Sequence, residues 1–201
     1  STHEMLDHRL TDYGITTTFV DTADPGAVLD AVQENTRVLY METISNPTMK
    51  VSAITPLTDL AHERGIVVVC DNTFASPYVM RPLEWGVDLV VESATKFIGG
   101  HSDVLGGAIC MKSEILSDDF LEQIRWDTMV KFGAPVSPFN AWLLLRGIQT
   151  LPVRVERQCR TAMALATHLA AHPSVNRVWY PGLVSHPQHH IAQVQMPKFG
   201  G

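Results

Sequence analysis

The stretch Ile66-Val67-Val68-Val69-Cys70-Asp71 decides the fold of this chain. Its residues are apolar at consecutive positions, so both faces of the segment are suited to burial, which is typical of a parallel strand inside a sheet. A second such strand is expected at Val87-Asp88-Leu89-Val90-Val91-Glu92, which is apolar at 89–91. A helical segment over 54–64 that ends at Gly65 precedes the first run, and a short helix over 82–85 precedes the second. Strands that alternate with helices predict an α/β fold.

The segments on either side continue this alternation. Apolar and β-branched runs predict further strands at 16–20, 36–42 and 107–111. Helical spacing of apolar residues predicts further helices at 24–33 and 113–129. This order predicts an open, mostly parallel sheet that is covered by helices on both faces.

The character of the chain changes in its last third. Helices are expected from Pro138 onward and over 152–171, and a strand is expected at 175–180. Two long helices followed by a strand indicate the start of a second, smaller α+β domain. We therefore expect a large domain over 1–147 and the beginning of a C-terminal domain over 148–201.

Composition excludes several classes of protein. The chain has 201 residues, of which 45% are hydrophobic, and a formal net charge of −6. This hydrophobic fraction excludes a disordered tail, and the acidic balance disfavours nucleic acid or an anionic membrane as a partner. No apolar run reaches the ~18–20 residues that a membrane helix needs. The three cysteines are spaced singly, so reduced thiols and a cytoplasmic location are expected.

Polar residues follow the two strands that decide the fold. One strand ends at Asp71, and the other ends at Glu92 and continues into Ser93-Ala94-Thr95-Lys96. Ligands of parallel sheets bind beyond the carboxyl ends of the strands, so we expect these residues at one crevice. In an extended chain, the hydroxyl groups of Ser93 and Thr95 point the same way and Lys96 points the other way.

An amine, a carboxylate and a pair of hydroxyl groups are the groups that pyridoxal phosphate requires. The amine forms a Schiff base with its aldehyde, the carboxylate keeps its pyridine nitrogen protonated, and hydroxyl groups donate to its phosphate. Spacing alone leaves other interpretations open. Lys96 alone is explained better as a surface lysine, and Asp71 alone equally well as a turn residue at the end of a strand. Ser93 and Thr95 alone are explained as residues of a turn.

The exact strings favour the cofactor interpretation. Asp71-Asn72-Thr73-Phe74 and the stretch 93–103, which reads SATKFIGGHSD, resemble the signatures of the Cys/Met-metabolism family of pyridoxal-phosphate enzymes. That family includes cystathionine γ-synthases, cystathionine γ-lyases, methionine γ-lyases and homoserine-ester sulfhydrylases. Supporting matches run in order along the chain at 42–48, 137–139, 145–151 and 180–188.

The resemblance implies roles for individual residues. Lys96 is the expected Schiff-base lysine and proton shuttle, and Asp71 the expected partner of the pyridinium nitrogen. Ser93 and Thr95 are the expected phosphate ligands.

Two further cofactor contacts are implied with them. Asn46 is expected near the phenolic oxygen of the cofactor, and Thr73 is expected to help seat the ring. The resemblance also implies a fold of the aspartate-aminotransferase type (fold type I) and a homotetramer, a dimer of dimers whose subunits share their active sites.

Several groups that the family uses are expected outside this chain. They include the tyrosine that stacks on the ring and the arginine that pairs with the substrate carboxylate, so the chain is expected to cover the middle half of such an enzyme. Alone, it is expected to bind cofactor poorly and to turn over negligibly.

The expected reaction is γ-elimination or γ-replacement on a sulfur amino acid or a homoserine ester, of the cystathionine γ-synthase or γ-lyase type. The alternatives are methionine γ-lyase and O-acyl-homoserine sulfhydrylase. Ser1, Met129 and Val130 stand where methionine γ-lyases usually carry Cys and a Lys-Asp pair, which disfavours that branch.

Three interpretations of other classes remain. One is an inactive, truncated homologue with a structural or interaction role. Another is an NAD-binding domain, which the absence of a GxGxxG motif disfavours. The third is a metal site at His186, His189 and His190, whose spacing is not that of a zinc site, so no metal is expected.

Overall fold

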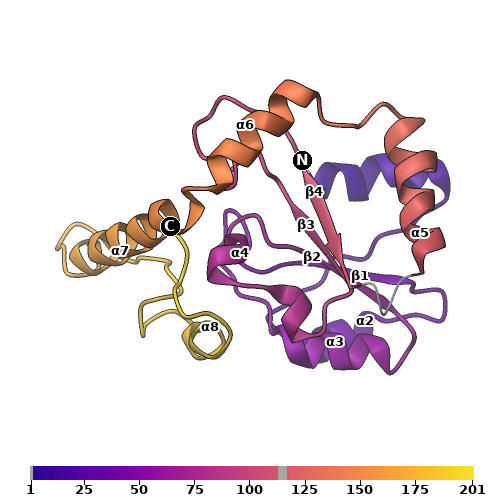
Figure 1. Ribbon diagram of the computed structural model, residues 1–201. Helices are drawn as coiled ribbons and strands as arrows, with labels where there is room; N and C mark the ends of the chain where they lie inside the picture. Colours follow the sequence, from indigo (N-terminus) through magenta and orange to yellow (C-terminus); the bar gives the residue numbers. More distant parts are fainter. Residues whose placement is uncertain (1, 113–116) are drawn as a thin grey trace.

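The sheet forms the centre of the computed structural model, which describes residues 2–112 and 117–201 (Figure 1). Its strands in the described part of the chain are β1 (Val38–Glu42), β2 (Val67–Asp71), β3 (Leu89–Glu92) and β4 (Ala108–Met111), in the order β1-β2-β3-β4. The first three strands are parallel, and β4 pairs with β3 in the antiparallel direction. The predicted mostly parallel α/β sheet is therefore confirmed.

Short helices connect the parallel strands. Helix α3 (Ile54–His62) joins β1 to β2, and α4 (Ser76–Val79) and the 3₁₀ helix η3 (Pro82–Trp85) join β2 to β3. Helix α3 buries Ile54, Leu57 and Ala61, which recur at helical spacing on one side. Gly65 follows this helix with a φ of 66°, a left-handed conformation that glycine adopts without strain and that turns the chain into β2.

The two faces of the sheet are covered unequally. Val68 and Cys70 of β2 have no exposed surface, whereas Val67 and Val69 on the opposite face are half-buried. The strand order advances in one direction, so right-handed crossovers place their helices on the same face. Helices were expected on both faces, but in the described residues only one face of β2 is fully buried.

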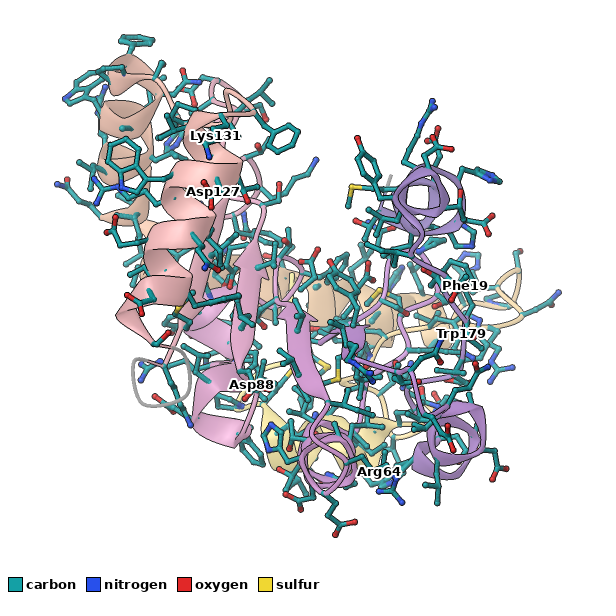
Figure 2. The ribbon with its side chains drawn as sticks, turned by 90° about the vertical axis from the view of Figure 1, so that its right-hand side faces the viewer. Phe19, Arg64, Asp88, Asp127, Lys131 and Trp179 are labelled. Carbon is teal, nitrogen blue, oxygen red and sulfur yellow. The ribbon has the colours of Figure 1, made fainter. Side chains whose placement is uncertain are left out.

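The remaining helices follow the sheet in sequence. They are α2 (Pro25–Ala31), which precedes β1, and then α5 (Asp118–Gln123), the π-helical η4 (Ile124–Val130), α6 (Pro138–Ile148), α7 (Leu151–Ala170) and α8 (His189–Gln195). The side chains of Ser117 and Ser137 accept backbone hydrogen bonds at the starts of α5 and α6. Figure 2 shows Asp127 of η4 paired with Lys131, which directly follows η4, away from Asp88, which directly precedes β3. The predicted start of the 113–129 helix lies outside the described residues.

Four local expectations differ from the structure. Segments 16–20 and 175–180 were predicted as strands but are irregular, since neither finds a neighbouring strand with which to form a hydrogen-bonded ladder among the described residues. The segment around His189 was expected to be a loop but forms α8. Residues 2–13, for which no element was predicted, are helical in three short pieces, which are α1 (Thr2–Glu4), η1 (Met5–Arg9) and η2 (Leu10–Tyr13).

The last helices pack against the sheet region. Leu151, Val155 and Cys159 of α7 belong to the same buried cluster as the residues of β2 and α3. The side chain of Gln195 on α8 accepts from Ile54 N at 2.8 Å and donates to Ser52 O at 3.0 Å. The boundary between 147 and 148 falls at the end of α6, and the division into two domains stays a prediction.

Candidate active site

The carboxyl ends of β1, β2 and β3 meet at one edge of the sheet (Figure 1). Two backbone hydrogen bonds continue the ladder past the strands: Thr43 N donates to Asp71 O and Asn72 N donates to Val91 O, each at 3.0 Å. The residues directly after these strands are therefore neighbours in space, as the parallel topology predicts.

Asp71, Thr73 and Ser93 are joined by a chain of hydrogen bonds. Thr73 N donates to Asp71 Oδ1 at 2.9 Å, and Ser93 N donates to Thr73 Oγ1 at 2.7 Å. The structure thus brings together the two strand ends that the sequence singled out, and Thr73 is the residue that connects them.

Tyr40 is a residue of this edge that the sequence analysis missed. Its hydroxyl donates to Asp71 Oδ2 at 3.2 Å. It also lies within hydrogen-bonding reach of the side chain of Thr2, so the first described residues approach the same edge. The register that pairs β1 with β2 places Tyr40 opposite Val69, two residues before Asp71, but this register is not visible in the sequence.

Negative charge crowds this edge of the sheet. Burial, and then the charge of Asp71, raise the pKa of Tyr40. Burial is also the largest cause that raises the pKa of Glu42; Asp71 adds to this effect, and a hydrogen bond from Asn46 N opposes it. Such surroundings disfavour further anions and favour a cation next to Asp71, such as a protonated ring nitrogen.

Lys96 lies in a turn directly after the strand end. Lys96 N donates to Ser93 O at 3.0 Å, and Gly100 N donates to Lys96 O at 2.8 Å. The side chain of Lys96 is exposed, so its amine is accessible to a ligand. An extended chain over residues 93–96 was expected, but the chain turns from Ala94 onward.

The two expected phosphate ligands are in different situations. Thr95 Oγ1 donates to Gly106 O at 3.2 Å and accepts from Gly106 N at 3.0 Å, so this hydroxyl is held by the backbone. The hydroxyl of Ser93 makes no hydrogen bond to the described part of the chain and is half-buried. Ser93 is therefore the hydroxyl of this pair that is ready to donate to a ligand.

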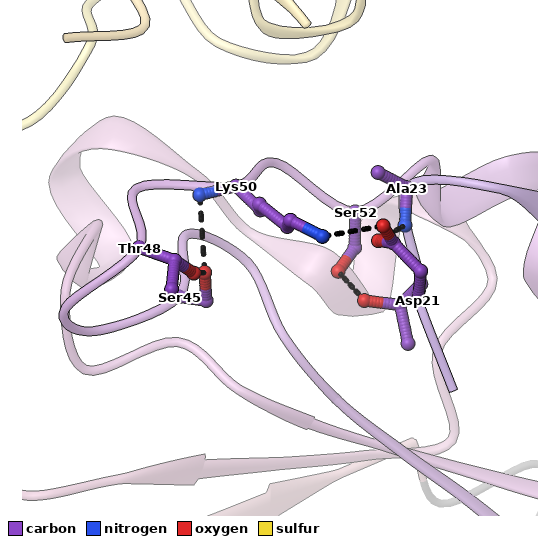
Figure 3. Close-up of polar contacts among 7 residues, drawn as sticks. Asp21, Ala23, Ser45, Thr48, Lys50 and Ser52 are labelled. Atoms are coloured by element: carbon purple, nitrogen blue, oxygen red, sulfur yellow. Dashed lines mark hydrogen bonds and ion pairs between the residues drawn. The ribbon is translucent and has the colours of Figure 1, made fainter. Parts of the chain in front are cut away.

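Asn46 lies in an exposed loop after β1, where its backbone N donates to Glu42 Oε2 at 2.9 Å. The loop is tied to the segment before α2 by two contacts, Lys50 with Asp21 and Ser52 with Thr22 (Figure 3). The segment before α2 therefore helps to hold the turn that carries Asn46.

A buried polar layer lies beneath the edge. Asn72 Nδ2 donates to Glu92 Oε1 at 2.9 Å, and Thr43 Oγ1 donates to Asn72 Oδ1 at 2.7 Å. Glu92 is 4% exposed, and burial raises its pKa to about 7. Cys70 lies in the same layer, where burial raises the pKa of its thiol to about 12.

Metal sites, membrane-spanning helices and pockets are further features that could indicate a function. Among residues 2–112 and 117–201, no group of three or more His, Cys, Asp or Glu side chains is arranged to hold a metal ion. No helix in the same ranges combines the length and the apolar character needed to cross a bilayer. An apolar hollow of about 400 Å³ beside α7, lined by Met163, Tyr180 and Phe199 among others, contains none of the predicted site residues.

Comparison with known proteins identifies relatives along the whole chain. A family model described as Cys/Met metabolism PLP-dependent enzyme matches residues 1–201. A probable cystathionine γ-synthase of Herpetosiphon aurantiacus is 45% identical over 200 residues, which cover 100% of this chain and 61% of that protein. A cystathionine β-lyase of Coxiella burnetii is 45% identical over 189 residues, which cover 94% of this chain and 48% of that protein.

A solved structure agrees with these relatives. The crystal structure of a cystathionine γ-lyase from Lactobacillus plantarum, complexed with L-serine, matches with a TM-score of 0.93 and 38% identity, over 99% of this chain and 51% of that chain. The chain therefore spans about half the length of most of the proteins that it matches. The three proteins carry the names of three different reactions at comparable identity, so overall similarity does not distinguish the reactions.

Proposed function

Because this chain belongs to the Cys/Met-metabolism family of pyridoxal-phosphate-dependent enzymes, we propose that the protein that carries it catalyses γ-elimination or γ-replacement on a sulfur amino acid or a homoserine ester. The observation that carries the proposal is the hydrogen-bonded chain from Asp71 through Thr73 to Ser93, with Lys96 in the next turn. A carboxylate, a hydroxyl group and an exposed lysine in the segments that directly follow two parallel strands support the proposal.

These groups fit pyridoxal phosphate. Bound cofactor supplies an electron sink that allows a proton to leave the α-carbon of the substrate. Asp71 would keep the ring nitrogen protonated, and its two oxygens retain free lone pairs because each accepts one hydrogen bond within residues 2–112 and 117–201. Lys96 would hold the cofactor by condensation of its amine with the aldehyde, which releases water, and would move protons between substrate carbons.

The remaining contacts are assigned in the same way. Ser93 Oγ would donate to the phosphate. Thr95 Oγ1 would donate to the phosphate in place of the hydrogen bond that it now donates to Gly106 O. Thr73 seats the ring through its position between the two strand ends, and Asn46 lies near the phenolic oxygen. The described residues supply few phosphate donors, which agrees with the expectation that residues 1–201 alone bind cofactor poorly.

Within the family, we propose the cystathionine γ-synthase or γ-lyase type of reaction. The departures at Ser1, Met129 and Val130 support it against methionine γ-lyase. The β-lyase relative supports a second candidate, β-elimination from cystathionine. We further propose that the protein acts in the cytoplasm as a homotetramer with shared active sites, on a small amino-acid substrate.

Labelling of Lys96 tests the cofactor assignment. The full-length gene product, supplied with pyridoxal phosphate, is expected to show a visible absorption band that borohydride removes, with the label on Lys96. Lys96→Ala is expected to lose turnover by orders of magnitude. Lys131→Ala, at an exposed lysine directly after η4, is the matched control and is expected to retain both the band and turnover.

Assays with cystathionine, methionine and acylated homoserine plus a thiol then identify the branch. A full-length protein that shows no band and no turnover would support the structural or interaction role and overturn the enzyme proposal. Robust turnover by residues 1–201 alone would overturn the expectation that this part is inactive.

A further inference from the structure

One arginine of α7 is bound to the backbone of the segment that follows Lys96. Arg154 Nη1 donates to Phe97 O at 2.8 Å, and Arg154 Nη2 donates to Ile98 O at 3.3 Å and to Gly147 O at 2.9 Å. The two carbonyls at 97 and 98 belong to the turn that begins at Lys96. The guanidinium of Arg154 therefore connects this turn to the end of α6 through hydrogen bonds.

The surroundings of Arg154 are carbonyl and hydroxyl oxygens. Arg154 Nε donates to Thr150 Oγ1 at 2.9 Å, and none of the hydrogen bonds of its guanidinium in the described residues goes to a carboxylate. The guanidinium is satisfied instead by backbone dipoles, including Gly147 O near the negative end of the α6 dipole. Burial lowers the pKa of Arg154, but an arginine stays protonated under such conditions.

Two glycines make this close approach possible. A Cβ on Gly100, whose φ is 75°, would lie 2.1 Å from Arg154 Nη1. A Cβ on Gly147 would lie 2.4 Å from Gly99 O and 2.7 Å from Ile98 O. The backbone of α6, the turn after Lys96 and the guanidinium are thus packed with no room for a side chain between them.

We propose that Arg154 is a positioning residue for Lys96, an inference that rests on the proposed function. The Lys96 side chain is exposed, so the described side chains do not enclose its amine, and its position is set by the backbone of its turn. Gly100 N donates to Lys96 O at 2.8 Å, which connects the lysine to the segment that Arg154 holds. A displacement of about 1 Å at a reacting group costs about 100-fold in rate.

Substitutions of Arg154 in the full-length, cofactor-loaded protein test this inference. Arg154→Gln is expected to lower kcat by about 10- to 100-fold, with KM within about threefold of wild type at equal cofactor content. Arg154→Lys keeps the charge but has no planar fork to span three carbonyls, so it is expected to restore only a small part of kcat. Arg157→Gln, at an exposed arginine of the same helix, is the matched control and is expected to keep the wild-type kcat.

Chemical rescue separates positioning from folding. Millimolar guanidinium is expected to raise kcat of Arg154→Ala and to leave Arg157→Gln unchanged. If Arg154→Gln kept the wild-type kcat, or lost it only in proportion to its folded fraction, the inference would be overturned. If Arg154→Gln did not fold, a wild-type kcat of Arg154→Lys would overturn it in the same way.

The proposed function and the positioning role of Arg154 are overturned by different results. Wild-type protein without a borohydride-sensitive band would overturn the proposed function, whereas an active wild type with Arg154 variants equal to the Arg157 control would overturn only the positioning role.

Discussion

Glu92 provides a prediction whose size follows from the structure. Glu92 is the last residue of β3 and is 4% exposed. Its carboxyl group accepts a hydrogen bond from Asn72 Nδ2 at 2.9 Å. Burial raises the pKa of Glu92 from 4.5 to about 7; the bond from Asn72 opposes this shift, and the charge of Asp71 adds to it. Glu92→Gln replaces the acid by a neutral group of the same shape.

The sign of the effect follows from proton binding. Between pH 4.5 and about 7 the folded protein holds a proton on Glu92 that the unfolded chain has released. The free energy of unfolding therefore falls as pH rises through this interval, and the full cost of the buried charge is present above pH 7. A difference of 2.5 pKa units corresponds to about 3 kcal/mol as an upper bound.

Urea denaturation of the full-length apoprotein at pH 5 and pH 8 measures this effect, at one protein concentration because subunit association adds to stability. Glu92→Gln is expected to stabilise the protein by about 2–3 kcal/mol more at pH 8 than at pH 5. Glu63→Gln, at an exposed glutamate, controls for the loss of one negative charge. An equal effect of Glu92→Gln at both pH values, or a larger gain at pH 5, would refute the reasoning.

Three further predictions concern packing, a hydrogen bond and thiol reactivity. Gly147→Ala forces a Cβ to 2.4 Å from a backbone oxygen and is expected to destabilise the protein by about 1–3 kcal/mol in urea denaturation, whereas Gly107→Ala, whose Cβ meets its nearest atom at 3.6 Å, is expected to be nearly neutral. Tyr40→Phe removes a bond of 3.2 Å to a carboxylate and is expected to lower the stability of the apoprotein by about 1 kcal/mol; an unchanged urea midpoint would contradict this. Cys110 is exposed and Cys70 is fully buried, so iodoacetamide at pH 8 is expected to label Cys110 first, as peptide mapping will show.

The sequence predicted the strands whose signal is local. β2 is apolar at consecutive positions, and its neighbours β1 and β3 begin and end within two residues of the predicted ranges. The end of the first predicted helix at Gly65 was visible in the sequence, because glycine adopts the left-handed conformation that ends helices. The short helix at 82–85 was visible because proline is common at the first position of a helix.

The sequence did not predict the secondary structure of segments that depends on contacts with other parts of the chain. Residues 16–20 and 175–180 have strand-like composition, but a strand forms only where another strand completes its hydrogen bonds. The helix at His189–Gln195 escaped prediction because its histidines and glutamines carry little periodic signal, while its stability comes from Ala192, which is fully buried, and from the contacts of Gln195.

The same distinction, between features with a local sequence signal and features that depend on tertiary contacts, applies to the candidate site. Asp71 and Ser93 were predicted as neighbours because parallel topology alone brings consecutive strand ends together, and the bond through Thr73 agrees with this. The contact of Arg154 with the carbonyls at 97 and 98 joins residues more than fifty positions apart, and its acceptors are backbone atoms that every residue possesses. No residue pattern marks such acceptors, so a group that holds the backbone of a site becomes visible only in three dimensions.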